Sequence, residues 1–267
     1  MKQKELVFLK LGGSLITDKG TPFTARTKTL HRISTEIAQA LREDSSLQLL
    51  IGHGSGSFGH VSADQHKTHT GGMDDDYWQG FSKVWLAARE LNQIVIESLS
   101  SSGLQVIAFP PSAGVISNNR QVDRWDIHPI QMALSRKLIP IVQGDVVFDR
   151  KMGGTILSTE QIFFFLSSQM SPSRILLAGI EEGVYLHSDH PEAIIPHITP
   201  SNIEKVLPFL SDLKTIDVTG GMYSKVEVML SLVKQNPALQ VQIFSGEKPG
   251  EICKALKSEP SGTRISA

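Results

Sequence analysis

The chain has 267 residues and a formal net charge of −1, so its charge predicts no broad attraction to nucleic acid or to an anionic membrane. Cys253 is the only cysteine, which excludes an intrachain disulfide and any zinc site built on paired cysteines. No apolar stretch approaches the roughly 18 residues of a membrane-spanning helix, and the apolar run 6–11 is interrupted by Lys10 and stops at Gly12. We therefore expect a cytoplasmic protein without a signal peptide that binds neither nucleic acid nor a membrane.

In the first half of the chain, short apolar runs alternate with segments of helical periodicity. We predict strands over 6–11, 47–51 and 105–109, and helices over about 27–42 and 75–101. The helix over 75–101 carries apolar residues at three- and four-residue spacing along most of its length, and Gly103 follows it as an end signal.

The same alternation continues to the end of the chain. The pattern predicts helices around 129–135, 160–168, 201–210 and 222–235, strands over 139–142, 174–178 and 241–244, a hairpin from 146–149 and 155–157, and a closing helix from Pro249. Alternating strands and helices favour an α/β fold with an open, mostly parallel sheet that helices cover on both faces. The chain shows no obvious linker, so we expect a single domain over residues 1–267.

A glycine-rich stretch over residues 52–60, Gly-His-Gly-Ser-Gly-Ser-Phe-Gly-His, directly follows the second predicted strand. Glycine lets backbone N–H groups approach a ligand closely, and a helix N-terminus favours anions. A segment of helical character follows this stretch, so the loop suits a phosphate group. His60 at its end could donate a further hydrogen bond to an oxyanion. The alternative at this point is a tight strand-to-helix turn with incidental histidines.

Three further glycine clusters lie at the ends of predicted elements. They are residues 10–14 (Lys-Leu-Gly-Gly-Ser), 144–145 (Gly-Asp) and 217–225 (Asp-Val-Thr-Gly-Gly-Met-Tyr-Ser-Lys). In open α/β sheets, ligands bind where strand carboxyl ends meet helix N-termini, so these clusters are expected to face one crevice. Lys10, Lys19 and Lys225 accompany them and could offset the charge of a polyphosphate.

Together these clusters resemble the amino acid kinase family over nearly the whole chain. The opening lysine, two glycines and serine stand at 10–14, and the late Thr-Gly-Gly-Met stands at 219–222 with Lys225 on the following helix. Within the family, His-Gly-Ser-Gly-Ser-Phe-Gly-His at 53–60 and Gly-Ser-Leu-Ile-Thr-Asp-Lys at 13–19 look like the isopentenyl phosphate kinases. The resemblance implies a three-layer αβα fold, with an acceptor-binding half over about 1–170 and a nucleotide-binding half over 171–267.

The resemblance also implies roles for individual residues. The expected catalytic residues are Lys10, Lys19 and His60. The expected acceptor-binding residues are Ser55, Gly56, Gly59, His60 and Thr159. The expected nucleotide-binding residues are Lys10, Gly12, Gly13, Ser14, Gly56, Ile180, Gly183, Tyr185, Gly221 and Lys225. The implied co-substrate is ATP with Mg²⁺, the implied partner is a small phosphorylated acceptor, and the implied assembly is a homodimer.

Two segments depart from the family pattern. The usual Ser-Gly-Asp before the central helix reads Ser158-Thr159-Glu160, which keeps a carboxylate but moves it by one methylene. The usual Thr-Asp-Val-Asp-Gly-Val-Tyr beside the nucleotide appears as Gly179-Ile-Glu-Glu-Gly-Val-Tyr185, with Ile180 in place of the first aspartate. These changes affect the expected nucleotide preference and acceptor more than the phosphate-binding framework.

If the acceptor is a monophosphate, its oxygen is already an anion, and transfer of a phosphoryl group needs positioning and charge stabilisation more than a general base. Lys10 and Lys19 are the candidates to bridge donor and acceptor oxygens. Mg²⁺ is implied by the triphosphate, and the sequence shows no metal-ligand motif of its own, so no protein metal site is expected.

Aromatic residues at the start of the helix over 75–101 are candidates for the acceptor's apolar tail. They are Tyr77, Phe81 and Trp85, with Trp78 beside them. Trp78, Phe81 and Trp85 follow one helical stripe, and the alternative is that this stripe is plain core.

Three other functions stay open. Gly54-x-Gly56-x-x-Gly59 also fits the dinucleotide fingerprint of an NAD-linked oxidoreductase, although Asp74–Asp76 lie in a polar turn where that fold wants a strand. A fosfomycin kinase would share the family, the loop and the histidine. A non-catalytic nucleotide- or anion-binding protein is the third alternative.

Overall fold

The computed structural model describes residues 4–66, 68–185, 194–206 and 221–267. An eight-stranded sheet forms its centre, in the order β10-β12-β11-β9-β1-β2-β6-β3. The strands are β1 (Glu5–Leu11), β2 (Leu47–His53), β3 (Val106–Ala108), β6 (Ile139–Gln143), β9 (Arg174–Gly179), β10 (His197–Ile198), β11 (Gln240–Ser245) and β12 (Thr263–Ile265). All neighbouring strands in it pair in parallel except β11 and β12, so the predicted mostly parallel sheet is confirmed.

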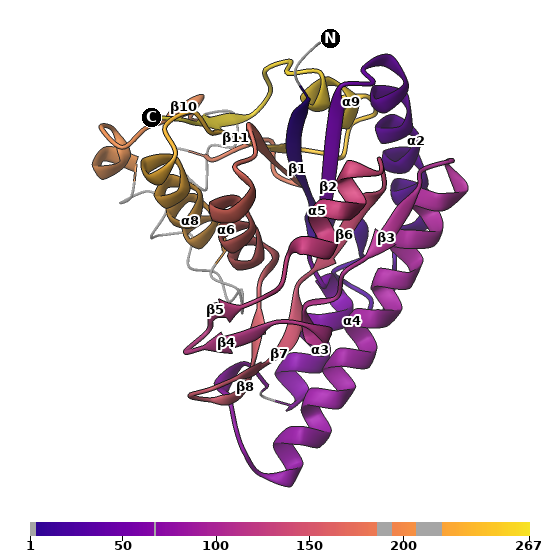
Figure 1. Cartoon of the computed structure of the whole chain (residues 1–267), viewed down its shortest axis with the longest axis vertical. Coiled ribbons are helices and arrows are strands. Elements are labelled where there is room, and N and C mark those ends of the chain that lie inside the picture. The colour runs from indigo at the N-terminus through magenta and orange to yellow at the C-terminus, as the bar shows by residue number, and fades with distance from the viewer. Residues whose placement is uncertain (1–3, 67, 186–193, 207–220) are drawn as a thin grey trace.

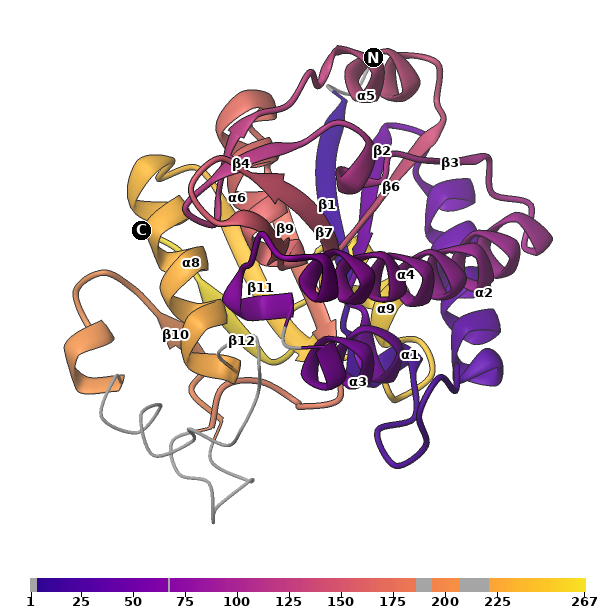
Figure 2. The same cartoon turned by 90° about the horizontal axis from the view of Figure 1, so that it is seen from below.

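Helices cover both faces of this sheet (Figures 1 and 2). The helices are α1 (Gly13–Ile16), α2 (Thr27–Glu43), α3 (Gly56–His66), α4 (Asp75–Ser101), α5 (His128–Ser135), α6 (Thr159–Met170), α8 (Gly221–Gln235) and α9 (Glu251–Leu256). On β1, Val7, Leu9 and Leu11 join a core that packs against α1, α2, α4 and α9. Phe8 joins the core on the other face, with α5, α6 and α8. The alternation of side chains along a strand therefore creates two cores from one strand.

A second, four-stranded sheet packs beside α4 (Figure 1). Its order is β5-β4-β7-β8, formed by β4 (Ile116–Asn118), β5 (Gln121–Arg124), β7 (Asp145–Asp149) and β8 (Gly153–Leu157). The sequence predicts the β7–β8 hairpin but not β4 and β5, because these strands have only three and four residues and little apolar character. β7 follows β6 after one residue, so this small sheet begins at the carboxyl edge of the large one.

The predicted elements agree closely with the structure. The helix over 75–101 has the predicted bounds, and Asp74 caps it by accepting a hydrogen bond from Tyr77 N–H (2.8 Å). Of the helix predicted near 201–210, residues 203–206 are helical, residues 201–202 form a turn, and residues 207–210 lie outside the described residues. None of the described helices is long and apolar enough to cross a membrane. Strands from both proposed halves share the large sheet.

Candidate active site

Two glycine loops meet at the carboxyl edge of the large sheet, after the neighbouring strands β1 and β2. A Cβ atom added to Gly13 would lie 2.5 Å from Gly56 N, and one on Gly54 would lie 2.9 Å from Gly13 N. Gly56 has a φ of +48°, and its Cβ would lie 2.1 Å from Thr17 Oγ1. Side chains have no room between these backbones, so glycine is required here for close approach.

Thr17 holds the two loops together. Its hydroxyl donates to Gly13 O (2.8 Å) and accepts from Ser57 N–H (3.0 Å), and the side chain is buried. The sequence analysis did not single out this residue. Its position four residues after Gly13 is the spacing at which a threonine hydroxyl reaches back to a helical carbonyl, which is the available signal.

A buried charge cluster lies beneath the loops. Lys10 Nζ donates to Glu160 Oε1, and both side chains are buried. Burial alone would raise the pKa of Glu160, but the positive charges of Lys10 and Lys225 and the hydrogen bond from Lys10 hold it below its ordinary value. Glu160 is one methylene longer than the aspartate that is usual in the family, and its carboxylate pairs with Lys10 at the end of β1.

His53 is a structural member of the same loop. Its Nδ1 lies 3.1 Å from Gly54 O, and its Nε2 lies 3.0 Å from Asn92 Oδ1. Burial lowers the pKa of His53, so the ring is neutral and carries one proton. Both neighbouring oxygens are acceptors, so the ring donates its single proton either from Nδ1 to Gly54 O or from Nε2 to Asn92 Oδ1.

The strand end of β9 supplies a third loop. Gly12 N–H donates to Ala178 O (2.8 Å), and a Cβ on Gly12 would lie 2.9 Å from the same oxygen. Ile180 O accepts from Ser245 Oγ (3.1 Å), which ties the loop to the end of β11. At Gly183, a Cβ would lie 2.8 Å from Thr263 Oγ1. The Tyr185 hydroxyl accepts from Glu182 N–H (3.1 Å).

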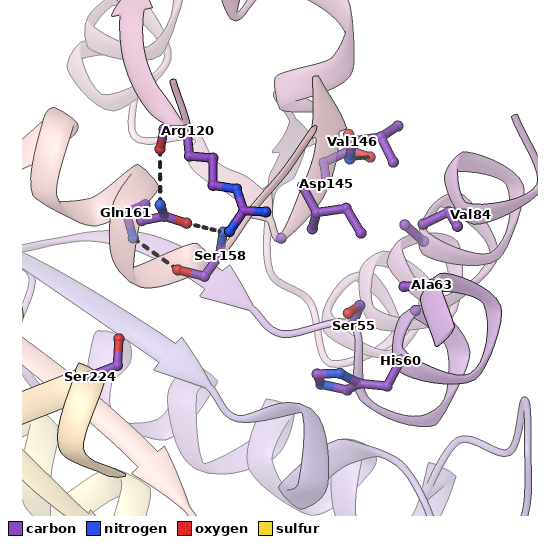
Figure 3. A pocket seen from close by; sticks show the side chains of 14 residues that line it. Ser55, His60, Ala63, Val84, Arg120, Asp145, Val146, Ser158, Gln161 and Ser224 are labelled. Atoms are coloured by element: carbon purple, nitrogen blue, oxygen red, sulfur yellow. Dashed lines mark hydrogen bonds between the residues drawn. The ribbon is translucent and has the colours of Figure 1, made fainter. Parts of the chain in front are cut away.

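A cavity of about 280 Å³ opens beside the first two loops (Figure 3). It is lined by Ser55, Gly59, His60, Ala63, Val84, Ala88, Arg120, Gly144, Asp145, Val146, Ile156, Ser158, Gln161 and Ser224. Ser55, Gly59 and His60 are predicted acceptor-binding residues, and the fold brings them together on one wall. Asp145 belongs to the Gly-Asp cluster that was expected to face the crevice, whereas Arg120, Ser158 and Gln161 were not predicted as lining residues.

The cavity has a polar end and an apolar end. Arg120, Ser158 and Gln161 form the polar end, and Figure 3 shows Arg120 and His60 reaching in from opposite sides of the cavity. Burial raises the pKa of Asp145 to about 6, against the hydrogen bonds that it accepts from Ser112 and Val146 N–H. The apolar end is formed by Ala63, Val84, Ala88, Val146 and Ile156.

The aromatic residues predicted for the tail do not line this cavity. Phe81 and Trp85 pack against the cluster of Ala63, Val84 and Val146 from outside, and Tyr77 is buried, with its hydroxyl donating to Thr68 O (3.2 Å). α4 instead presents Val84 and Ala88, which lie four residues apart on one helix face. α4 therefore contributes to the cavity through Val84 and Ala88, and the assignment of the aromatic residues to the acceptor's tail stays a prediction.

The remaining predicted residues have different settings. The Thr159 hydroxyl is buried and donates to His53 O (2.7 Å), so it is used by the fold. Lys19 is exposed on the loop after α1 and makes no hydrogen bond or ion pair with the described residues.

The start of α8 lies near the cavity. Gly221, with a φ of +60°, begins this helix, which carries Ser224 to the cavity and Lys225 toward Glu160. Ser14 lies in α1 between the first two loops. Residues 217–220 of the fourth glycine cluster lie outside the described residues.

A comparison with protein families and known proteins matches the chain from residue 5 to residue 245 with the amino acid kinase family. The chain belongs to the amino acid kinase family. It is 33% identical over 266 residues to the isopentenyl phosphate kinase of Methanocaldococcus jannaschii, covering 97% of this chain and 98% of that one. It is 31% identical over 277 residues to the isopentenyl phosphate kinase of Methanothermobacter thermautotrophicus, covering 98% and 99%.

Solved structures of similar proteins have the same fold. A crystal structure of isopentenyl phosphate kinase superposes with a TM-score of 0.82 at 28% identity and covers 98% of this chain and 100% of that one. An N-acetylglutamate synthase from Neisseria gonorrhoeae superposes with a TM-score of 0.68 at 10% identity, and that likeness concerns the fold alone. The sequence resemblance to the family and the αβα architecture are both confirmed.

Proposed function

We propose that this kinase transfers the γ-phosphoryl group of ATP to the phosphate of isopentenyl phosphate, giving the diphosphate and ADP. The observation that carries the proposal is a cavity lined both by residues of a glycine-rich, phosphate-binding type of loop and by small apolar side chains. Its volume of about 280 Å³ lies just below the range of roughly 300–1,000 Å³ that is usual for ligand cavities. A phosphate head with a short hydrocarbon tail fits both its chemistry and its size. The full-length similarity to isopentenyl phosphate kinases supports the same substrate.

In the proposed reaction, an oxygen of the acceptor phosphate attacks the γ-phosphorus, and the bond from that phosphorus to the β–γ bridging oxygen breaks. The attacking oxygen is already an anion, so no base has to remove a proton. The difficulty is to hold two anions together in line. N–H groups at Ser55 and Gly56, with His60, would hold the acceptor.

In the proposal, Lys10 contacts the transferred phosphoryl group and Lys225 contacts the phosphates of the nucleotide. Glu160 accepts a hydrogen bond from Lys10, which positions Lys10 before substrate arrives, and the charge of Lys225 also acts on Glu160. Lys19 is the third cation in the proposal, on an exposed loop from which its charge can act as transfer proceeds. Because its charge is expected to matter most in the transition state, Lys19→Ala should lower kcat more than it raises either KM.

The nucleotide proposal rests on the loops at the ends of β9 and β11 and at the start of α8. Ile180, Gly183, Tyr185 and Gly221 belong to these segments, with Gly12, Gly13, Ser14 and Gly56 on the acceptor side. Among the described residues, no three His, Cys, Asp or Glu side chains gather as a metal site. The residues therefore suit Mg²⁺ that arrives with the triphosphate oxygens as part of the co-substrate. A homodimer and a cytoplasmic location complete the proposal.

The proposal is tested by incubating the protein with Mg-ATP and isopentenyl phosphate and following the product by ³¹P NMR. We expect a diphosphate signal and stoichiometric ADP. Isopentenol serves as the control acceptor, because it has the same tail but no phosphate, and it should not react. Transfer to fosfomycin without transfer to isopentenyl phosphate would make the protein a phosphonate kinase. ATP binding without transfer to either acceptor would leave only a binding protein.

A further inference from the structure

The turn between β4 and β5 places an arginine in an unfavourable backbone conformation. Asn119 and Arg120 join the two strands and have φ values of +51° and +66°. Positive φ at both central residues is the mark of a type I′ hairpin turn, which favours Asn followed by Gly. Asn119 satisfies the first preference. Arg120 occupies the position where glycine would avoid the steric cost of the left-handed region. A side chain retained against this cost points to a function.

Neighbouring groups fix the backbone of Arg120 firmly. Its N–H donates to Asp149 Oδ2 (2.9 Å), and its carbonyl accepts from Gln161 Nε2 (2.9 Å). Asp149 also accepts from Asn119 N–H (3.1 Å) and from Ser117 Oγ (2.7 Å). Gln161 is held in turn by the capping box that it forms with Ser158 at the start of α6. The turn is therefore anchored on both sides.

This anchoring directs the Arg120 side chain toward the polar end of the cavity. Arg120 lines the cavity, and Figure 3 shows its guanidinium facing the space between Ser158 and Asp145, across from His60. Among the residues that line the cavity, it is the side chain that is charged at every physiological pH.

The charge at this end of the site favours a cation. Glu160 offsets much of the positive charge of Lys10 and Lys225, and Asp145 adds a carboxyl group to the cavity wall. A phosphate monoester carries between one and two negative charges near pH 7. A guanidinium presents planar paired donors that match two phosphate oxygens.

We propose that Arg120 binds the acceptor phosphate from the hairpin side of the cavity, opposite His60, and that it selects a phosphorylated acceptor over a neutral alcohol. The inference rests on the proposed function and assigns its acceptor site a further binding residue. The left-handed backbone is the structural cost of placing this cation at the hairpin turn.

The decisive variant is Arg120→Gly, because it removes the guanidinium while giving the turn its preferred residue. We expect its Tm to equal or exceed that of the wild type, while KM for isopentenyl phosphate rises about 10- to 30-fold, as for a lost hydrogen bond to a charged group at a solvated site. KM for ATP should stay within twofold. Arg120→Lys keeps a positive charge and should recover part of the loss.

Asn119→Gly is the matched control, since Asn119 has the same backbone conformation and the same anchor but does not line the cavity. Its KM for isopentenyl phosphate should stay within twofold of the wild type. The proposal is overturned if folded Arg120→Gly keeps the wild-type KM for isopentenyl phosphate, or if KM for ATP rises equally.

A titration of isopentenyl phosphate into the protein without nucleotide, followed by calorimetry, separates this inference from the proposed function. If the wild type binds the compound and Arg120→Gly binds it at least tenfold more weakly, Arg120 is a binding residue even where no transfer occurs. Equal binding by both proteins, or no binding by the wild type, would reject the assignment.

Discussion

The two walls of the cavity are built in different ways. On the wall from the large sheet, backbone meets backbone: Gly13, Gly54 and Gly56 approach too closely for any side chain. On the wall from the small sheet, hydrogen bonds from side chains fix the backbone. Asp149 accepts hydrogen bonds from backbone N–H groups of two turns, and Gln161 donates to the backbone carbonyl of Arg120 in one of these turns. A phosphate that must sit close to the chain needs the first kind of wall. The second kind of wall can change its shape through substitution of single side chains.

The largest effect is expected at the sheet wall, from Lys10→Ala. The variant leaves Glu160 buried without its hydrogen-bond partner, which should lower the free energy of unfolding by about 3–5 kcal/mol. We also expect kcat to fall about 10³-fold, because a cation near the transferred group is lost. Urea unfolding and steady-state kinetics measure both effects.

The double variant Lys10→Met with Glu160→Gln should recover most of the stability and none of the activity, because it leaves no buried charge unpaired. Lys28→Ala is the control, since Lys28 is exposed on α2. A Lys10→Ala protein as stable and as active as the wild type would contradict the assigned role.

At the hairpin wall, Asp149→Ala should have the next largest effect. Asp149 accepts hydrogen bonds from Ser117 Oγ and from the N–H groups of Asn119, Arg120, Lys151 and Met152. These bonds outweigh burial and hold the pKa of Asp149 well below its ordinary value. We expect a loss of about 3 kcal/mol in the free energy of unfolding at pH 7, since several bonds to a charge are lost together. This difference should persist down to about pH 4 and shrink as the pH falls further.

Asp123→Ala is the matched comparison, because Asp123 lies in the same small sheet but makes an exposed ion pair with Arg150 (3.0 Å). It should change stability by less than about 0.5 kcal/mol. Similar losses for the two variants would mean that Asp149 is not what holds this wall.

Asp145, where the two sheets join, should give a pH-dependent effect. Its raised pKa means that the folded state binds the proton more tightly than the unfolded state between the ordinary value of 3.8 and about 6. Its contribution to stability is therefore fully present below about pH 4 and lost as the pH rises through about 6. Relative to the wild type, Asp145→Asn should gain about 3 kcal/mol between pH 4 and pH 7. Urea unfolding of both proteins at the two pH values measures this change. A pH-independent difference for Asp145→Asn would contradict the raised pKa.

For His60, we expect acceptor efficiency to fall about 10- to 150-fold on substitution by alanine, with KM for ATP unchanged. His60→Gln should keep part of the efficiency, because an amide can also donate a hydrogen bond. His31→Ala, at an exposed position on α2, is the control. Unchanged acceptor kinetics in His60→Ala would remove the loop from the acceptor site.

The smallest effect is expected at the apolar end. Val84→Ala widens this end of the cavity by two methylene equivalents, so a longer isoprenyl monophosphate should gain about fourfold to tenfold in relative efficiency. Leu86→Ala, on the exposed side of the same helix, should leave the chain-length profile unchanged. A changed profile in the Leu86 variant alone would place the tail elsewhere.

The two walls also differ in how far the sequence predicts them. The sheet wall can be predicted from the sequence because close approach of two backbones requires glycine, and the glycines at 12–13 and 52–59 are conspicuous in the sequence. The roles of Arg120 and Asp149 cannot be predicted from the sequence. A short polar hairpin has no periodicity, and an arginine in a turn looks like an ordinary surface residue. On α4, periodicity predicts a buried face but does not distinguish the residues facing the cavity, Val84 and Ala88, from the aromatic residues packed behind them.

The place of β1 in the strand order has a consequence for biosynthesis. β1 precedes the other described strands in the chain but lies in the middle of the large sheet, paired with β2 on one side and with β9 on the other. Most of the apolar residues of β1 are buried in the folded protein. One edge of β1 therefore stays unpaired until residues 174–179 have left the ribosome. An unpaired apolar strand edge is prone to association with other chains. We expect nascent chains shorter than about 180 residues to depend on chaperones, and the kinase to become competent to bind nucleotide only after β9 has paired with β1.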